Sequence, residues 1–577
     1  MFRRLRHLNA SLVAFALMLI FFAAFFVWPI VSTLKEAFYF SGDEDTGFTT
    51  AYVEDVLSDS RYIVGLINAL IVGTLSTLGA VIIALPLAIV ADRYNFPYKG
   101  ILSSLLLVPL VLPPFVGALG VKHILGQSGA LNVFLSWFGL VDMSNPVDWL
   151  GEHQFVGMVI MNALHLYPIV YLNIAAALAN LDPAYEEAAE NLGCSPFQRF
   201  LYITLPMTMP GLFAGCTIAF IWGFTELGVP LVFDFTQITP VQIFHGIKDM
   251  DSSPFPYALV TVVLFITAAI FLLSKKLIGK QEYSSSGRAS VGRTAIQLTG
   301  WKAWTSFTVF VLVILAATVP HIGVVFVAMS TDWYMSVLPE SLTLEHFEEA
   351  LGHPLTVPSI GNSLKYAGFA TLLNLVIGVA IAYVVVRTKV WGRNLLDTMA
   401  MLPLAVPGLV LAFGYLAMTQ EGRAFHFLVN NPIVGTGNPL LILIIAYAVR
   451  RLPYIVRSAV AGFQQTSRSL EEASLNLGCS PAKTLFRITL PLIAANLIAG
   501  SILAFAFSML EVSDSLILAQ KQVHFPITKA IYTLFAALGD GPYLAAALGV
   551  WAMAFLTVSI VGAGFLLGKK MGALFRA

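Results

Sequence analysis

The sequence predicts an all-α polytopic membrane protein with twelve transmembrane helices, arranged as two parallel six-helix repeats. Three observations support this fold class: the composition, the length of the apolar stretches and an internal repeat. Of the 577 residues, 58% are hydrophobic and only 11% are charged. Soluble proteins carry about 25% charged residues, so most of the surface of this chain does not face water. The net charge of zero gives no indication of nucleic-acid binding.

Apolar stretches long enough to cross a membrane occur twelve times. A bilayer core of about 30 Å requires about 20 apolar residues in a helix. The expected spans are 10–32, 63–91, 101–121, 155–180, 206–233, 257–274, 303–329, 362–387, 395–418, 439–463, 491–519 and 543–567. We interpret the first as a membrane helix, because its apolar run is too long for a signal peptide and no small-residue cleavage site follows.

The charges of the connecting segments predict the orientation. The segments that we assign to the cytoplasm hold Arg3, Arg4, Arg6, Arg93, Lys99, Lys275, Lys276, Lys280, Arg288, Arg293, Arg387, Lys389, Arg393, Lys483, Arg487, Lys569, Lys570 and Arg576. The opposite side collects Asp43, Glu44, Asp45, Glu54, Asp55, Asp59, Asp249, Asp251, Glu345, Glu348 and Glu349. The positive-inside rule therefore places both termini in the cytoplasm.

The chain contains an internal repeat. Three pairs lie 294 residues apart, namely Asn68 with Asn362, Pro109 with Pro403 and Pro113 with Pro407. Further along, the offset is 285, for Pro168 with Pro453, Glu186 with Glu471, Gly193 with Gly478, Pro206 with Pro491 and Glu226 with Glu511. An insertion in an outer loop of the first half explains the change. We predict a first half at 1–274, a cytoplasmic linker at 275–302 and a second half at 303–577, related as parallel repeats.

Two cytoplasmic loops, 180–206 and 465–491, share one helix–turn–helix design. Asp182 and Ser467 can cap the first helix by accepting backbone N–H bonds. Gly193 and Gly478 fall where a left-handed residue ends that helix. Packing within a membrane gives no reason to duplicate a cytoplasmic protrusion, whereas a two-fold symmetric partner does. The residues that we expect to engage it are Glu186, Glu187, Ala188, Gly193, Glu471, Glu472, Ala473 and Gly478.

The stretches "EEAAENLG" and "EEASLNLG", each followed by "ITLP", resemble the EAA loop of permeases in binding-protein-dependent ABC importers of type I architecture. This resemblance covers the whole chain. It implies that each loop inserts into one of two copies of an ABC ATPase subunit, and that an extracytoplasmic solute-binding protein delivers the substrate. It also implies a bacterial plasma (inner) membrane protein that transports and is not an enzyme. ATP and Mg would be bound by the partners, because the chain lacks the GxxxxGK[ST] phosphate loop, and no cofactor is expected in this chain.

The fused halves and the stretches "PLVLPPFVGALG" and "RRLPYIVRSAVAGFQQ" are most similar to the ferric-iron permease subfamily. The resemblance therefore implies ferric iron as the substrate. A phosphonate, a sugar phosphate or another small organic anion is the alternative, because Arg450 and Arg451 suit an anion equally well. In this class the binding protein sets most of the specificity.

Ionisable residues at membrane depth are costly and indicate function by default. Here they are His165, Arg450, Arg451, Glu226, Glu511 and Asp514. Two interpretations stay open: the residues line the substrate pathway, or they pair between helices and hold the bundle together. We expect Pro109, Pro113, Pro403 and Pro407 to shape broken helices.

Other classes of function fit less well. Twelve spans in two parallel halves also describe secondary transporters, but that class has no reason to duplicate the loops at Glu186 and Glu471. Exporters have longer helices that extend into the cytoplasm, and a non-transporting scaffold is the remaining alternative. The three cysteines Cys194, Cys216 and Cys479 form no CxxC pair, so we expect neither a disulfide framework nor a metal site.

Overall fold

The computed structural model describes residues 2–39, 47–110, 113–151, 154–179, 181–250, 253–278, 295–432 and 435–567, and almost all of its regular structure is helical. Much of the predicted linker, 279–294, lies outside the described residues, as do the charged positions Asp43, Glu44, Asp45, Asp251, Lys280, Arg288, Arg293, Lys569, Lys570 and Arg576.

Fourteen helices precede the linker in the described part of the first half. They are α1 (Phe2–Phe22), α2 (Trp28–Phe38), α3 (Ala51–Ser58), α4 (Ser60–Arg93), α5 (Lys99–Leu105), α6 (Pro114–Leu125), α7 (Ala130–Trp137), α8 (Phe155–Ala179), α9 (Pro183–Asn191), α10 (Pro196–Arg199), α11 (Leu205–Phe224), α12 (Gly228–Val232), α13 (Thr239–Gly246) and α14 (Phe255–Ile278). A π-helical turn, η1 (Ala23–Val27), joins α1 and α2.

The second half contains a similar series. Its helices are α15 (Gly300–Met329), α16 (Glu345–Gly352), α17 (Thr356–Arg387), α18 (Arg393–Met401), α19 (Gly408–Met418), α20 (Leu440–Gln465), α21 (Arg468–Asn476), α22 (Pro481–Thr484), α23 (Leu490–Met509), α24 (Ser513–Leu518), α25 (Ile527–Phe535) and α26 (Gly541–Leu567).

The described residues also contain short strands. These are β1 (Tyr94–Asn95), parallel to β2 (Ile296–Gln297), and β3 (Asn430–Asn431), antiparallel to β4 (Gly435–Thr436).

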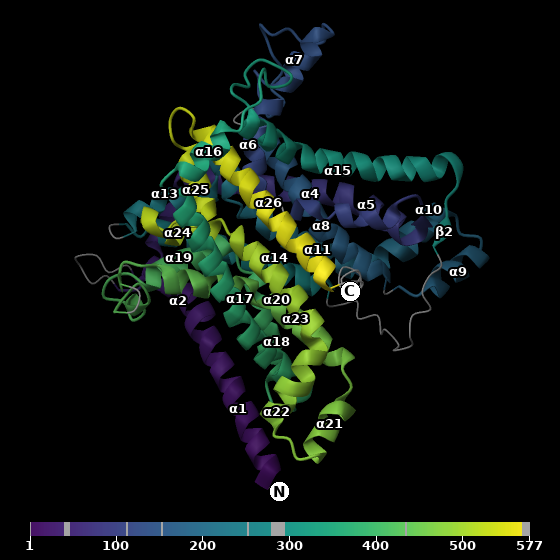
Figure 1. Ribbon diagram of the computed structural model, residues 1–577, viewed down its shortest axis with the longest axis vertical. Coiled ribbons are helices and arrows are strands. Elements are labelled where there is room, and N and C mark those ends of the chain that lie inside the picture. Colours follow the sequence, from purple (N-terminus) through teal and green to yellow (C-terminus); the bar gives the residue numbers. More distant parts are fainter. Residues whose placement is uncertain are drawn as a thin grey trace.

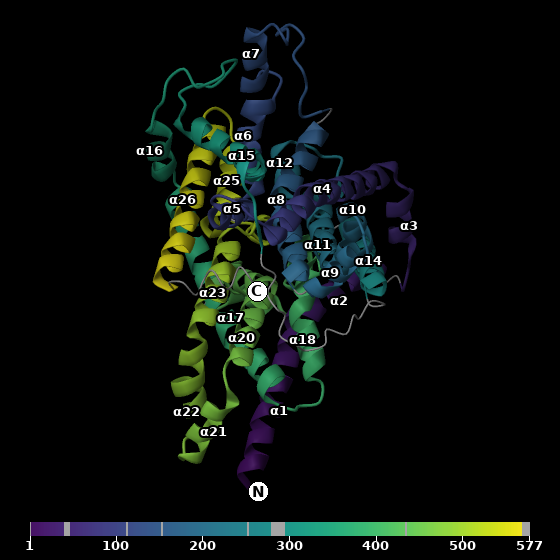
Figure 2. The ribbon, with the colours of Figure 1, turned by 90° about the vertical axis from the view of Figure 1, so that its right-hand side faces the viewer.

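The helices form two arms that diverge from a common apex (Figure 1). The first arm contains α4, α5, α8, α11 and α15 and ends at α9 and α10. The second arm contains α1, α17, α18, α20 and α23 and ends at α21 and α22. The apex holds α7, α16 and α25, and the view turned by 90° again places these helices at the end opposite α21 and α22 (Figure 2).

The first helix of each half packs on the arm of the other half. Helices α1 and α2 contact α17, α18 and α19, whereas α15 contacts α4, α5 and α6. A repeated glycine allows this close approach. A Cβ atom at Gly120 would lie 2.1 Å from the carbonyl oxygen of Pro320, and one at Gly414 would lie 2.5 Å from that of Pro29. The pairing of β1 with β2 also ties the first half to the segment directly before α15.

The described residues contain nine helices that are long and apolar enough to cross a membrane, or up to eleven if two bent pairs each count as one span. The bent pairs coincide with the expected spans at 101–121 and 395–418. The chain bends by 94° between 99–110 and 114–137 and by 100° between 393–404 and 408–418. Pro109 and Pro403 lie in the 3₁₀ turns before these bends, so the prediction that prolines shape broken helices is confirmed. Proline lacks the N–H that a continuous helix requires.

The predicted tenth span at 439–463 is the helix α20, which does not meet the same apolar criterion over the described residues. It contains Arg450, Arg451 and Arg457, and most of its other residues are buried. It packs against α17, α19 and α23, so protein surrounds it on several sides.

Candidate functional site

The two loops at the ends of the arms have the predicted helix–turn–helix form. The side chain of Asp182 accepts the amide of Ala184 at the start of α9, at 3.0 Å, and Ser467 accepts that of Ser469 at the start of α21, at 3.3 Å. Ser195 caps α10 and Ser480 caps α22 in the same way. Capping side chains satisfy backbone donors that a helix start leaves without partners.

A left-handed glycine ends the first helix of each loop, as the sequence predicts. Gly193 has φ +83° and Gly478 has φ +89°. The following amides close the turn, because Cys194 donates to the carbonyl of Ala189 at 3.0 Å and Cys479 donates to that of Ser474 at 3.1 Å. This hydrogen-bond pattern is typical of a helix that ends at glycine. Side chains other than glycine rarely adopt this conformation.

An arginine from a neighbouring long helix holds each loop in place. Arg93, the last residue of α4, donates to Glu186 at 2.6 Å and to Thr204 at 2.7 Å. Thr204 in turn donates to Glu186 at 2.5 Å. The side chain of Glu186 is therefore partnered within the chain, and the residue is only 3% exposed.

The second loop repeats this clamp. Arg387, the last residue of α17, donates through Nε to both carboxylate oxygens of Glu471 at 3.0 Å. Thr489 donates to the same carboxylate at 3.3 Å. The arginines are 294 residues apart and the glutamates 285 apart. Charge-assisted hydrogen bonds of this kind are stronger than neutral ones, so both clamps fix the loops relative to the long helices.

The remaining predicted loop residues divide into exposed and buried groups. Glu187, Ala188, Gly193, Glu472, Ala473 and Gly478 are exposed, whereas Glu186 is buried and Glu471 is half-buried. The two clamp glutamates thus orient the loop in this conformation, and the other residues form its surface.

The tip of each loop carries an exposed leucine that was not predicted from the sequence. Leu192 is 84% exposed and Leu477 is 87% exposed, each directly before the left-handed glycine. They lie 285 residues apart. Tyr185 and Leu470, another pair at this offset, are also exposed. The signal was available, because an apolar residue recurred at matching positions in two otherwise polar helices.

Buried charges gather in the second half where α20 meets α24. Arg450 and Arg451 both donate to the carboxylate of Glu511. Asp514, which is completely buried, lies 3.7 Å from Arg450. The guanidinium of Arg451 also lies over the ring of Phe507, 5.6 Å from its centroid. Two guanidinium groups thus face two carboxylates inside the protein.

The backbone at the broken helix makes room for one of these arginines. A Cβ atom at Gly408, the first residue of α19, would lie 2.0 to 2.4 Å from the guanidinium atoms of Arg450. The arginine therefore packs directly on the backbone after the bend. Glycine is required at position 408 for as long as Arg450 occupies this position.

The other two predicted intramembrane residues have different partners. The Nδ1 atom of His165 lies 2.8 Å from the carbonyl oxygen of Pro109. Glu226 accepts the backbone amide of Gly228, the first residue of α12, at 3.0 Å. An electrostatic interaction links Glu226 to Glu511 and Arg450, but the described residues show no ion pair of Glu226 within 4 Å. The structure thus joins Arg450, Arg451, Glu511 and Asp514 and leaves His165 and Glu226 outside that cluster.

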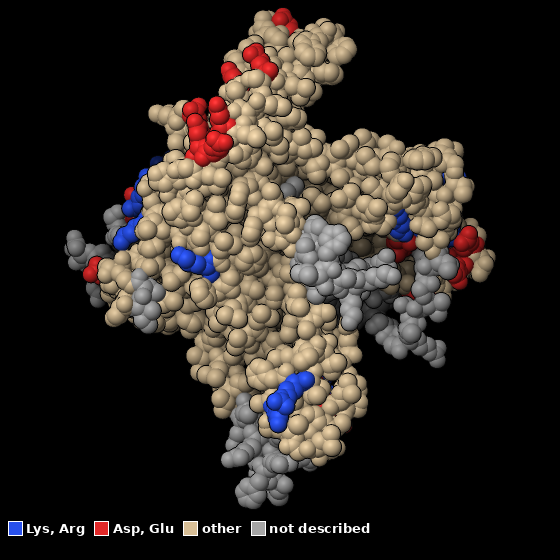
Figure 3. Space-filling view, viewed as in Figure 1, with Lys and Arg blue, Asp and Glu red and all other residues tan. Residues whose placement is uncertain are grey.

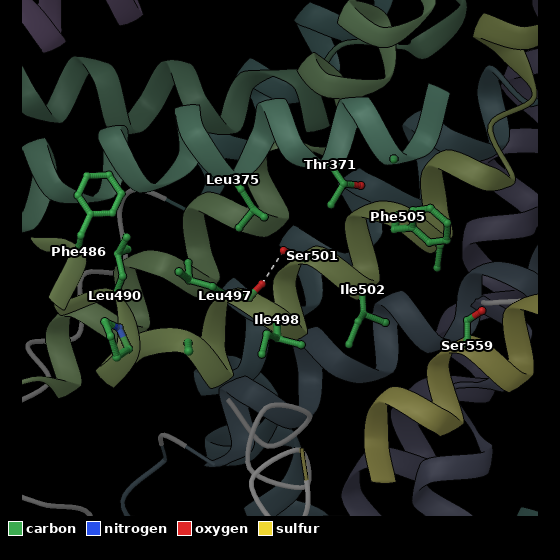
Figure 4. A pocket seen from close by; sticks show the side chains of 14 residues that line it. Thr371, Leu375, Phe486, Leu490, Leu497, Ile498, Ser501, Ile502, Phe505 and Ser559 are labelled. Carbon is green, nitrogen blue, oxygen red and sulfur yellow. Dashed lines mark hydrogen bonds between the residues drawn. The ribbon is translucent and has the colours of Figure 1, made fainter. Parts of the chain in front are cut away.

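Two cavities have different chemistry. One of about 670 Å³ lies between α17, α23 and α26 and has almost entirely apolar walls (Figure 4). Its hydroxyl groups at Ser501 and Ser559 donate to carbonyls of their own helices, both at 2.7 Å. The other, of about 770 Å³, lies at the apex and is lined by charged and polar groups that include Lys122, His123, Asp148, Asp332 and Tyr334.

In the described part of the chain, no three His, Cys, Asp or Glu side chains lie close enough together to hold a metal ion. Cys194 and Cys479 lie on separate loops at the ends of the two arms.

Comparison with known proteins gives two matches to one family along the chain. The family is described as the binding-protein-dependent transport system inner membrane component, and it matches residues 80–281 and 374–563. The ferric transport system permease protein FbpB of Actinobacillus pleuropneumoniae is 30% identical over 515 residues, which cover 86% of this chain and 70% of that protein.

Two relatives from Haemophilus influenzae extend the comparison. A protein provisionally named ferric transport system permease protein FbpB 1 is 31% identical over 521 residues, covering 87% of this chain and 77% of the relative. The molybdenum transport system permease protein ModB is 30% identical over 218 residues, covering 36% of this chain and 91% of the relative. The second of these relatives thus aligns over most of its length with a much smaller part of this chain.

Proposed function

Because this chain belongs to the family of binding-protein-dependent transport system inner membrane components, which are transport subunits rather than enzymes, we propose that it is the permease subunit of an ATP-driven importer of ferric iron. ATP and Mg are bound by two copies of an ABC ATPase subunit, and an extracytoplasmic binding protein delivers the iron. No cofactor resides in this chain.

The duplicated loop at the end of each arm is the observation that carries this proposal. Each loop presents an exposed leucine beside a left-handed glycine, and each is held by an arginine clamp. Two matching apolar protrusions at the ends of separate arms suit two identical partners. Movement of the partners toward each other would move the arms, because the clamps connect the loops to α4 and α17.

The orientation and the number of spans follow from the same proposal. The loops face the cytoplasm, the apex faces outward, and both termini lie inside. Acidic side chains gather over α16 at the apex and basic atoms lie at the α22 end of the molecule, while the α9 end of the first arm carries acidic side chains (Figure 3). We count α20 as the twelfth span, because its counterpart α8 is apolar enough to cross a membrane and its own Arg450 and Arg451 are paired internally. The two halves are then parallel repeats about an axis normal to the membrane.

The iron assignment comes from the names of the two relatives that cover most of the chain. A small organic anion remains the second candidate, supported by the basic residues Arg450 and Arg451. Both arginines already face Glu511, so this cluster supports interhelical pairing more than contact with the cargo.

The test is uptake of radioactive iron by proteoliposomes that contain the permease, its ATPase and its binding protein. The double variant Gly193→Asp with Gly478→Asp should insert and fold but lose at least nine-tenths of the uptake, because both turns that present the loops are strained. Normal ATP-dependent uptake by this variant would contradict the docking proposal. Uptake driven by a proton gradient without ATP would identify a secondary transporter instead.

A further inference from the structure

Two lysines lie at the apex, each over an aromatic ring of the opposite half. The ammonium of Lys122, in α6, lies 5.5 Å from the ring centroid of Phe535 in α25. The ammonium of Lys529, in α25, lies 5.6 Å from that of Phe244 in α13. Each lysine also covers a ring of its own half, Phe233 at 6.0 Å or Phe525 at 5.4 Å. These reciprocal contacts, which we call the apex closure, join the two halves.

Other contacts of the apex closure are aromatic. The ring of Phe244 meets that of Tyr532 edge to face, with the centroids 6.0 Å apart. The closure thus contains two lysines and the five aromatic residues Phe233, Phe244, Phe525, Tyr532 and Phe535. Leucine or methionine would fill the same space without a charge, so packing alone does not explain the choice of lysine.

Neither lysine is balanced by a close carboxylate. Within the described residues, no acidic group lies within 4 Å of Lys122 or Lys529. Lys529 donates to the carbonyl of Leu516 at 2.6 Å. Lys122 interacts electrostatically with the exposed Asp234, without direct contact. Lysine is rarely buried unless it is paired, so two half-buried lysines that depend on rings and one carbonyl are unusual.

Space for a polar ligand lies beside the closure. Lys122 lines the apex cavity of about 770 Å³ together with His123 and the carboxylates of Asp148 and Asp332, whereas Lys529 is not among the lining residues. A contact between an ammonium and an aromatic ring contributes about 0.5 to 2 kcal/mol. Hydrogen bonds between ionised groups are stronger, so an anion that reaches this place could replace the rings as partner of the lysines.

We propose that Lys122 and Lys529 form an anion-receiving pair, which holds the apex closed on aromatic rings and binds anionic oxygen groups when the halves separate. This inference rests on the proposed importer function. It means that iron crosses as a complex with anionic ligands and not as a bare trivalent ion, which two ammonium groups would repel. The two lysines would also bind a free oxyanion, and the experiments below distinguish a free anion from one that is bound to iron.

The first experiment measures binding of radioactive citrate and of inorganic phosphate to the complete importer trapped with vanadate. We expect the double variant Lys122→Met with Lys529→Met to bind at least one of these anions at least tenfold more weakly than the wild type. The pair Lys122→Arg with Lys529→Arg should retain most of the binding, because it keeps the charges. Lys521→Met is the matched control. This exposed lysine lies in the same half as Lys529, donates to the carbonyl of Thr436 and takes no part in the closure. Equal binding of both anions by the wild type and the methionine pair would overturn the proposal.

The second experiment measures uptake of ⁵⁵Fe supplied with ¹⁴C-citrate or ³²P-phosphate. If the anion travels with the metal, the wild type should accumulate both labels, and the methionine pair should show a raised KM for iron uptake. Iron uptake that is unchanged or faster in the methionine pair would contradict the inference. If the wild type binds phosphate but imports phosphate without iron, the ferric assignment fails and the lysine site stands.

Discussion

At the scale of single residues, a substitution at Glu511 can distinguish the two interpretations of the buried charges. It accepts hydrogen bonds from Arg450 and Arg451, and its side chain is 3% exposed. Replacing it by glutamine leaves two buried guanidinium groups with only Asp514 nearby. Breaking a buried ion pair costs about 3 to 5 kcal/mol, so we expect Glu511→Gln to lower the unfolding temperature of the purified protein clearly.

The control for this measurement is Glu226→Gln, at the matching position of the first half. Glu226 accepts one backbone amide and belongs to no ion pair within the described residues. We expect a much smaller change in unfolding temperature. If Glu511→Gln is as stable as the wild type but fails to transport, the cluster lines the pathway and the pairing interpretation is wrong.

Lys529 gives the stability of the protein a dependence on alkaline pH. Burial lowers the pKa of Lys529 from 10.5 to about 8. Between these values the unfolded chain binds more protons than the folded protein, so the free energy of unfolding rises with pH. We expect the wild type to gain thermal stability relative to Lys529→Met between pH 8 and pH 10. A constant difference over this range would show that the lysine titrates normally.

At the scale of elements, the loop tips are where we propose that the ATPase meets the chain. Leu192 and Leu477 expose apolar surface at the end of each loop. Burying a leucine side chain contributes about 1.5 to 3 kcal/mol. The variant Leu192→Ser with Leu477→Ser should therefore weaken binding of the ATPase at least tenfold, measured by co-purification and by titration in detergent.

Leu538→Ser serves as the control for the loop variant. Leu538 is 99% exposed and lies between α25 and α26, at the apex and far from both loops. We expect it to bind the ATPase like the wild type. Equal loss of binding in both variants would indicate a general effect of exposed leucines on solubility and not docking at the loops.

The sequence was informative about local elements and less so about long-range partners. Gly193 and Gly478 were placed correctly, because a left-handed turn depends on the residues beside it. The bends after Pro109 and Pro403 were anticipated only as broken helices, since hydropathy measures composition and not direction. The arginines of the clamps were assigned to the cytoplasmic side, but their bonds to Glu186 and Glu471 join residues 93 and 84 positions apart. No local pattern specifies such a contact.

At the scale of the whole molecule, the exchange of first helices makes the halves depend on each other. Helices α1 and α2 pack on the second arm and α15 packs on the first. We expect a chain cut within 279–294 to assemble when both pieces are expressed together and to recover most of the uptake. Either piece alone should be degraded, because its arm lacks one covering helix. Immunoblots of membranes and iron uptake are the measurements.

If the second piece alone were stable, the halves would not depend on the packing of each first helix on the other arm. A second cut, at Asp59 between α3 and α4, separates α1, α2 and α3 from the rest of the chain. We expect joint expression of these two pieces to restore iron uptake as well, since α1 can still pack on α17 and α18.

The place of α1 has a consequence for the order of events during synthesis. Helix α1 leaves the ribosome well before α17, which begins only at Thr356. At about 5 to 20 residues per second, its lasting neighbours emerge on the order of a minute or less after it. During that interval α1 must wait in the lipid or beside an insertion factor. Helix α1 is thus made long before it can reach its final position, and a ribosome that stalls before Thr356 leaves it without these neighbours.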